Sequence, residues 1–371
     1  MLPLLVLTGC GAEAADGHDS GSGKARPAWT VVAPADLRIG ASETGSDALV
    51  FPVAGERLAH GDIAIADAGN HRVDVFDSKG RKVRSIGREG RGPGEFSSPS
   101  WLGVRGDTLL VWDIVQSRLT RFDTAGILIG TDPPVTDLGS FPRVAGQRAD
   151  GSLLTIASVS GEWRAGTYRD SLLILWMWPD GRRDTVATAP GDDQFGTRSQ
   201  NGRVSETTTL PFGRRTVVAV HGQRVYLGTA DSPVIVAASD GRTWDTVARV
   251  LTPPVPVTRQ DIDEFWSRLV VTGSRSSAAA PAGIEYPRYF PPYTDLRVAS
   301  GGDTWICLPS RPSEWSVSSR WLVFAPDGTL RGSVEIPGRN RVLQVGNGWI
   351  LVAETDADDR QMVVKYSLSP P

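Results

Sequence analysis

The residues best suited to recognising a ligand lie in one short segment, Glu285-Tyr286-Pro287-Arg288-Tyr289-Phe290-Pro291-Pro292-Tyr293. Its prolines restrict the backbone to extended conformations. Aromatic faces beside one guanidinium suit the recognition of sugars, peptides or carboxylates. We expect these aromatic side chains to pack beneath a neighbouring helix. The alternative, which makes Tyr286, Arg288, Tyr289 and Tyr293 the candidate ligand-binding residues, is that they line a ligand pocket.

Residues that could perform catalysis or hold a transition metal are few. The sequence has four histidines and two cysteines, Cys10 and Cys307, which do not form a zinc motif. Cys307 lies in an apolar run, and this indicates a buried free thiol. No Gly-x-Ser-x-Gly elbow occurs, so serine hydrolysis is not indicated. We expect no catalytic residue and no metal site; calcium held by oxygen ligands from separate segments is the alternative.

The N-terminal residues indicate export. Residues 2–7 are apolar but too few to span a bilayer, and they are typical of the end of a signal peptide. The next residues, Leu7-Thr8-Gly9-Cys10, resemble a bacterial lipobox. The resemblance implies that residues 1–26 are a lipoprotein signal and flexible tether with a lipid on Cys10. Because Gly11 follows the cysteine, we expect a cell-envelope protein anchored to the outer membrane, facing the periplasm or the cell surface.

Internal repeats predict the architecture of residues 27–371. A glycine followed by an apolar strand recurs six times, at Gly61, Gly106, Gly151, Gly222, Gly302 and Gly348. Subtracting these positions gives gaps of 45, 45, 71, 80 and 46 residues. Three of the gaps match one four-stranded propeller blade, and the other two match a blade plus an insertion.

A second repeated feature follows the first five of these strands. It is an apolar strand that ends in an Asp-containing turn, and the glycines of these turns are Gly80, Gly126, Gly181, Gly241 and Gly328. The sixth repeat lacks this turn, and an N-terminal strand from residues 29–32 or 37–39 can supply its outer strand. We therefore predict an all-β fold: a six-bladed β-propeller of four-stranded antiparallel blades, closed by N- and C-terminal strands.

The first repeat carries a family resemblance. Its Asp67-Ala-Gly-Asn70-His71-Arg72 turn and its Gly90-Arg-Gly-Pro-Gly-Glu-Phe96 segment resemble an NHL repeat. The chain is similar to bacterial six-bladed propeller lipoproteins. We expect Asp67, Asn70, His71 and Arg72 to be structural, because asparagine suits a left-handed turn and arginine can bond Asp67 or a neighbouring blade.

Two insertions interrupt the repeats. The first, about residues 189–215, is polar and is predicted to be a solvated loop. The second, about residues 252–295, begins with Thr258 as a helix N-cap, and apolar residues then follow at helical spacing from Ile262 to Val270. This pattern predicts one amphipathic helix of about three turns, which would cover one mouth of the propeller channel or help to form a pocket there.

Charge and fold together suggest the function. The net charge is −3, and basic residues are interspersed with acidic ones, so nucleic-acid binding is not indicated. We expect a membrane-tethered, non-enzymatic module that binds a protein, peptide or glycan through its loop face. The alternative, implied by the propeller resemblance, is a calcium-dependent enzyme like the propeller lactonases or lyases.

Overall fold

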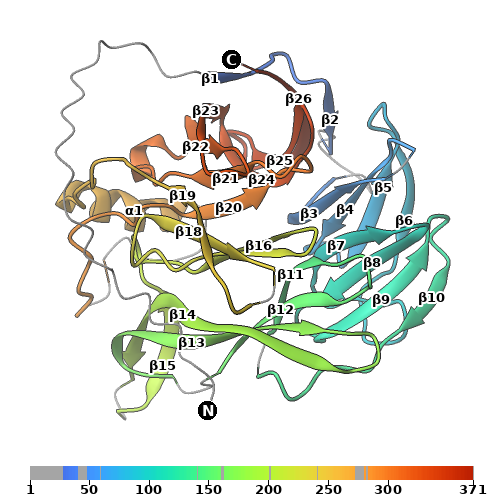
Figure 1. The fold of residues 1–371 in the computed structure, drawn as a ribbon, viewed down its shortest axis with the longest axis horizontal. Helices are drawn as coiled ribbons and strands as arrows, with labels where there is room; N and C mark the ends of the chain where they lie inside the picture. The colour runs from blue at the N-terminus through green and yellow to red at the C-terminus, as the bar shows by residue number, and fades with distance from the viewer. Residues whose placement is uncertain are drawn as a thin grey trace.

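The computed structural model describes residues 28–40, 48–58, 60–139, 141–159, 163–199, 202–239, 241–271, 280 and 283–370. These residues form six blades of antiparallel strands arranged around a central axis, and the last two blades are joined into one nine-stranded sheet (Figure 1). The predicted all-β, six-bladed propeller is therefore confirmed. None of the helices within these ranges is long and apolar enough to cross a bilayer.

The first three blades follow one another along the chain. Blade 1 contains β3 (Pro52–Arg57), β4 (Ile63–Asp67), β5 (Arg72–Phe76) and β6 (Lys82–Ile86). Blade 2 contains β7 (Pro99–Arg105), β8 (Thr108–Asp113), β9 (Arg118–Asp123) and β10 (Leu128–Thr131). Blade 3 has five strands: β11 (Arg143–Gln147), β12 (Leu153–Ser158), β13 (Gly166–Met177), β14 (Arg183–Arg198) and β15 (Val204–Thr209).

The last three blades contain the remaining strands. Blade 4 contains β16 (Val217–His221), β17 (Arg224–Gly228), β18 (Val234–Ala238) and β19 (Asp245–Arg249). Blade 5 contains β20 (Asp295–Val298), β21 (Thr304–Cys307), β22 (Ser318–Phe324) and β23 (Leu330–Pro337). Blade 6 contains β24 (Arg339–Val345), β25 (Trp349–Thr355), β26 (Gln361–Ser369) and the N-terminal β2 (Leu37–Ile39).

The glycine repeats mark the turns that separate these strands. The six repeated glycines precede the second strand of each blade, and all of them have positive φ, from 57° at Gly106 to 92° at Gly61. The five glycines of the second repeated feature precede the fourth strands of blades 1 to 5, and their φ values are also positive. An L-residue is strained in this region, so both patterns reflect backbone geometry.

Apolar side chains fill the spaces between neighbouring blades. Each of the six largest clusters of buried apolar residues draws its members from two adjacent blades, so that the clusters together form a complete ring. The second strands are buried on both faces; in β4, every residue is buried. This packing explains why these strands are continuous apolar runs in the sequence.

The two ends of the chain close the ring. In β2, Leu37 pairs with Lys365 and Ile39 with Val363, so β2 is the outer strand of blade 6. The preceding strand, β1 (Ala28–Val31), runs parallel to β23 and antiparallel to the end of β26. The predicted closure is confirmed, and β1 extends it to blade 5.

The prediction of a solvated loop at about residues 189–215 is wrong. β14 continues to Arg198 and pairs with β15, which adds a fifth strand to blade 3. Alternate residues of β14 are buried, but these include Ala187, Gly191 and Asp193. Because these residues are small or charged, the alternation of burial does not produce an alternation of hydropathy.

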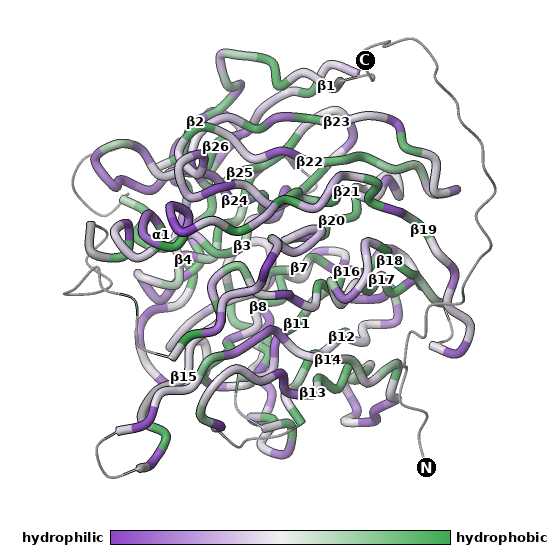
Figure 2. Tube along the Cα trace, turned by 90° about the vertical axis from the view of Figure 1, so that its left-hand side faces the viewer, coloured by the Kyte–Doolittle hydropathy of each residue, from purple (hydrophilic) through white to green (hydrophobic). Residues whose placement is uncertain are grey.

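The predicted helix is confirmed as α1 (Arg259–Val271). The Asp261 backbone N–H donates to Thr258 Oγ1 (3.2 Å), and Thr258 N–H donates to the Asp261 carboxylate (2.8 Å). This reciprocal pair satisfies donors that a helix start leaves free. Figure 1 shows α1 at the edge of the propeller, beside blades 4 and 5. In the side view of Figure 2, α1 and β15 lie on the same side of the molecule.

Tyr293 fixes blade 4 to blade 5 just before β20 begins. Its side chain is fully buried in the cluster between these blades. Its hydroxyl accepts from Ala230 N–H (2.8 Å) and donates to the Val234 carbonyl (3.2 Å). Burial raises the pKa of Tyr293 to about 12, so the hydroxyl keeps its proton.

Blade 1 contacts blade 6 through the last residues of their inner strands, β3 and β24. Gly55 lets Leu343 and Leu351 approach, since a β-carbon there would lie 2.7 Å from Leu351 and 3.1 Å from Leu343. Next to this contact, Gln344 Nε2 donates to the Glu56 carboxyl (2.9 Å). Burial raises the pKa of Glu56 to about 7, and the amide only partly opposes this effect.

We predict that Tyr293→Phe lowers the free energy of unfolding by about 1–3 kcal/mol, because the buried Ala230 N–H loses its acceptor. Urea denaturation at pH 7 measures the change. The matched control is Tyr289→Phe, at a tyrosine that is 41% exposed; it should change stability by less than about 0.5 kcal/mol. Equal effects of the two substitutions would contradict the role assigned to Tyr293.

The Glu56 carboxyl predicts a dependence of stability on pH. The pKa of Glu56 in the folded protein, about 7, exceeds its ordinary value of 4.5. The contribution of this carboxyl to the free energy of unfolding is therefore complete below pH 4.5 and is lost as the pH rises through 7. We expect Glu56→Gln to remove this slope and to be more stable than the wild type at pH 8, by up to about 3 kcal/mol. Denaturation series from pH 4 to 8 test this, with the exposed Glu335→Gln as control. An unchanged slope in Glu56→Gln would refute it.

Candidate functional site

A central channel is the main candidate for a ligand site. Residues from all six inner strands line a cavity of about 880 Å³ along the propeller axis, a volume typical of small-ligand pockets. The inner strands β3, β7, β11, β16, β20 and β24 all run in the same direction along it. Their first residues therefore lie at one end of the channel, which we call the mouth.

Four arginines line the cavity near the mouth. Arg143 is the first residue of β11, and Arg297 and Arg341 are the third residues of β20 and β24. Arg215 lies two residues before β16 begins. The carboxylates that line the same region are Asp192 and Asp295, so guanidinium groups outnumber carboxylates by four to two.

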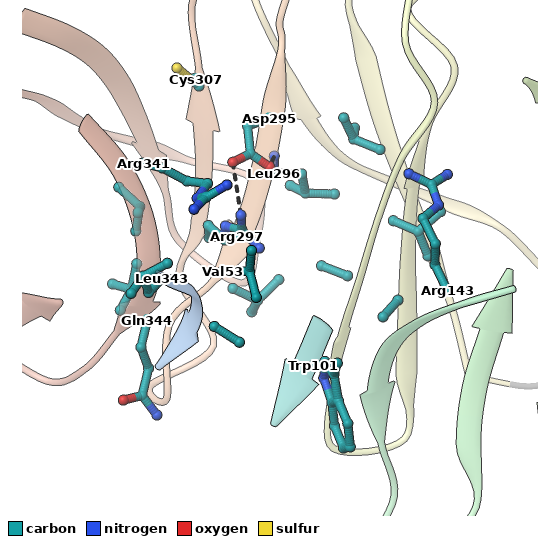
Figure 3. A pocket seen from close by; sticks show the side chains of 18 of the residues that line it. Val53, Trp101, Arg143, Asp295, Leu296, Arg297, Cys307, Arg341, Leu343 and Gln344 are labelled. Carbon is teal, nitrogen blue, oxygen red and sulfur yellow. Dashed lines mark hydrogen bonds and ion pairs between the residues drawn. The ribbon is translucent and has the colours of Figure 1, made fainter. Parts of the chain in front are cut away.

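Arg297 and Arg341 form a pair of cations on one wall. Arg297 bonds Asp295 across 3.0 Å, and the Leu296 N–H occupies the other oxygen of Asp295 (Figure 3). Arg341 donates to the Pro52 carbonyl of blade 1, and its guanidinium lies 5.3 Å from the centre of the Phe51 ring. The Nε atoms of both arginines are buried and have no hydrogen-bond partner within the described chain.

The electrostatic environment of this wall favours an added negative charge. Burial lowers the pKa of Arg341 from its ordinary value, and the positive charge of Arg297 lowers it further. The negative charge of Asp295 opposes this lowering of the Arg341 pKa, but Asp295 already forms an ion pair with Arg297. An anion beside the two guanidinium groups would relieve both their desolvation and their repulsion.

Arg143 faces this pair from the opposite wall of the channel (Figure 3). Its side chain and that of Arg215 are exposed, and neither forms a hydrogen bond or ion pair with the residues that the structure describes. Both guanidinium groups can therefore bond a ligand without breaking an internal contact. Together with Arg297 and Arg341, they present donors from blades 3, 4, 5 and 6.

A partly buried charge cluster holds the mouth segments in place. Arg214 bonds Asp193 through its backbone N–H (2.7 Å) and its side chain (3.0 Å), and it bonds Asp231 at 2.6 Å. Arg169 also bonds Asp231, at 2.8 Å. The next turn is fixed by the Thr216 N–H, which donates to Asp192 (2.9 Å). These bonds join blades 3 and 4 and position Arg215 at the channel.

The channel residues do not fit a calcium ion. Calcium requires about six to eight oxygen ligands, whereas the mouth carries two carboxylates, Asp192 and Asp295, and four cationic side chains, and the third carboxyl group that lines the cavity, Glu56, lies at the opposite end. Within the described ranges, no group of three or more His, Cys, Asp or Glu side chains could hold a metal ion. Cys307, which also borders the cavity, is buried, and burial raises its pKa to about 12.

The predicted motif residues form a structural turn at the mouth. Asp67 accepts from the N–H groups of Val50 (3.1 Å) and Phe51 (2.9 Å) and from the Asn70 amide (2.7 Å). His71 has a positive φ of 53°, and its Nδ1 donates to the Ser97 carbonyl of blade 2 (2.7 Å). Arg72 bonds Asp74 at 3.0 Å. Two details of the prediction are wrong: the left-handed residue of the turn is His71 and not Asn70, and the ion-pair partner of Arg72 is Asp74 of its own blade and not Asp67.

Blade 2 repeats this turn at equivalent positions. Asp113 accepts from the N–H groups of Ser97 (2.6 Å), Ser98 (2.9 Å) and Val115 (3.0 Å). Gln116 replaces the asparagine, and Ser117 replaces the histidine with a φ of 50°. A buried carboxylate thus fixes both the start of the inner strand and the neighbouring turn in each of the first two blades.

The structure separates the four candidate ligand residues of the aromatic segment. Tyr293 is buried between blades, and the Tyr286 hydroxyl accepts from Trp266 Nε1 of α1 (2.7 Å). Arg288 lies over the Tyr289 ring at 5.3 Å, and Tyr289 is exposed. None of the four lines the channel cavity, and no residue of α1 does so. Phe290, Pro291 and Pro292 instead border a second cavity of about 940 Å³ next to blades 4 and 5.

Sequence reasoning missed the four arginines because they are far apart in the chain. No local motif joins residues 143, 215, 297 and 341. The available signal was position: each lies at or near the start of the first strand of a blade, where the inner strands converge. The predicted lipidation site, Cys10, lies outside the described residues.

Comparison with known proteins supports the architecture. The model of a family described as a 6-bladed beta-propeller, DUF5128, matches residues 42–132. No curated protein sequence matches the chain. Similar solved structures include a member of the DUF4221 family from Bacteroides vulgatus, with a TM-score of 0.54 and 11% identity over 92% of this chain and 99% of that one.

Virginiamycin B lyase from Staphylococcus aureus is also similar, with a TM-score of 0.46 and 11% identity over 89% of this chain and 97% of that one. Identities this low carry no information about activity. The family model, the DUF4221 structure and the six blades described above agree on one conclusion: the chain is a six-bladed β-propeller.

Proposed function

We propose that this propeller is a binding module that recognises an anionic ligand, through a carboxylate or phosphate group, at the arginine-lined mouth of its channel. The observation that carries the proposal is the set of four guanidinium groups around one cavity, two of which have no side-chain partner among the residues that the structure describes. Guanidinium groups bond carboxylate and phosphate oxygens with charge assistance and defined geometry.

The distribution of the arginines supports binding by several blades at once. Arg143 lies across the channel from Arg297 and Arg341, so an anion between the walls can accept from both sides. The internal ion pair with Asp295 orients Arg297, and the bond to Pro52 orients Arg341. Such preorganisation reduces the entropy lost on binding.

The alternative of a calcium-dependent lactonase- or lyase-like enzyme has less support. That chemistry would place carboxylates and amides around a cation, whereas the charges at this mouth attract anions. The hypothesis that the ligand is a protein, a peptide or a glycan is compatible with this proposal, because each of these can carry an anionic group.

We further propose that the propeller is held in the cell envelope by a lipid on Cys10. The support is the sequence Leu7-Thr8-Gly9-Cys10 after an apolar run. A tethered propeller can present its mouth to ligands at the membrane surface.

We predict that the purified full-length protein binds citrate, and that Arg143→Gln weakens this binding by at least about tenfold, because one charge-assisted contact is lost. Isothermal titration calorimetry at low and high salt measures Kd, and the affinity should fall as salt increases. Arg143 is suitable because it supports no other group in the described structure.

The matched control is Arg105→Gln, which removes the same charge from an exposed residue at the far end of β7. It should leave the citrate Kd unchanged. The proposal fails if citrate, glutarate and phosphate all show no binding at millimolar concentrations, or if the two arginine variants behave alike.

The anchor predicts incorporation of lipid. In a bacterial host grown with labelled palmitate, the wild-type protein should carry the label and sediment with membranes, and Cys10→Ser should lose both properties. Cys307→Ser is the matched control, since the Cys307 thiol is buried; it should keep the label. Label that persists in Cys10→Ser would rule out this site.

A further inference from the structure

The geometry points to a protein segment as the ligand: an acidic side chain enters the channel mouth while apolar neighbours on the same segment pack against an exposed apolar rim. The inference rests on the proposed anion site and adds the class of partner. It is carried by a second feature of the mouth, a set of exposed apolar residues on the first three blades.

Four large apolar side chains are exposed where the first three inner strands begin. Val50 and Phe51, which are 51% and 48% exposed, directly precede β3. Val115, 47% exposed, lies beside the segment that enters β7, and Phe141, 58% exposed, lies two residues before Arg143. Together we call these residues the apolar rim. Exposed apolar residues gathered beside a site are typical of protein-binding surfaces.

Buried carboxylates hold much of this rim rigidly. Asp67 accepts from the backbone N–H groups of Val50 and Phe51, and Asp113 accepts from that of Val115. Both aspartates have no exposed surface. The buried carboxylates thus fix the backbone of loops whose apolar side chains are exposed to solvent. Rigid loops lose little conformational entropy when a partner binds.

Phe141 is held by a different contact. Trp112 Nε1 donates to the carbonyl of the next residue, Pro142, at 2.8 Å. The φ of Phe141 is 59°, a region in which a bulky residue is strained. Backbone strain that leaves a phenyl group in water is a feature associated with functional sites.

The rim and the arginines together define the chemistry of the partner. The apolar residues come from blades 1 to 3, whereas Arg215, Arg297 and Arg341 come from blades 4 to 6. A ligand that contacts both must extend across the mouth, which a small anion between the arginines would not do. A peptide with an aspartate or glutamate flanked by aromatic or aliphatic side chains meets both requirements, and Arg with aromatic residues is the usual composition of strong protein-binding sites.

The test uses displayed nonapeptide libraries selected against the full-length protein. One library fixes aspartate at the centre, and the other fixes asparagine there. We expect enrichment only from the aspartate library, with aromatic or aliphatic residues within two positions of the aspartate. For a selected peptide made synthetically, aspartate-to-asparagine exchange and the Val115→Ser/Phe141→Ser double variant should each weaken binding at least tenfold.

Two controls separate this inference from the proposed anion site. Ile127→Ser removes an exposed apolar residue at the turn between β9 and β10, away from the mouth, and should leave peptide binding unchanged. Citrate binding is measured on every variant. If citrate binds and depends on Arg143, but no aspartate peptide is enriched or the double variant binds its peptide normally, the partner inference is wrong and the anion site stands. If neither citrate nor peptides bind, both proposals fail.

Discussion

Closure of the ring is the constraint on which the rest of this structure depends. Each blade buries its apolar faces against two neighbours, so no blade is complete until the last is in place. The closing contact is made by residues more than three hundred positions apart: β2 pairs with β26, and Lys365 bonds Asp36 at 2.8 Å. Once the circle is complete, the six inner strands converge on one axis, and side chains that are distant in sequence surround a single cavity.

The ring could be predicted from the sequence because its signals are local and repeated. A positive φ is required at each turn into a second strand, and glycine accepts it with little strain, so Gly61, Gly106 and their equivalents mark the blades directly. The helix was predictable for the same reason, since Thr258 and Asp261 satisfy each other's backbone donors. The extension of β14 was missed because its buried face carries Asp193, whose charge is paired with Arg169 on the adjacent strand β13 and with Arg214 in the segment before β16.

The site was less predictable because its chemistry is distributed. Arg143, Arg215, Arg297 and Arg341 acquire a common role only after the strands converge, and an exposed or half-buried arginine in a strand carries no distinct signal by itself. The composition of the aromatic segment suggested a ligand site, but Tyr293 fixes two blades together and the Tyr286 hydroxyl accepts a hydrogen bond from α1. A segment rich in aromatic residues can be a packed core or a ligand-binding site, and only the three-dimensional structure distinguishes the two.

The geometry of β1 has a mechanical consequence. Its first half pairs with β23 of blade 5 and its second half with β26 of blade 6, so the strand lies across the seam of the ring. A force applied along the axis of β1 from its N-terminal end would load the hydrogen bonds of both blades in shear, and these bonds would have to break together rather than one after another. The ring is thus reinforced where a chain entering from the N-terminal side would transmit tension to it.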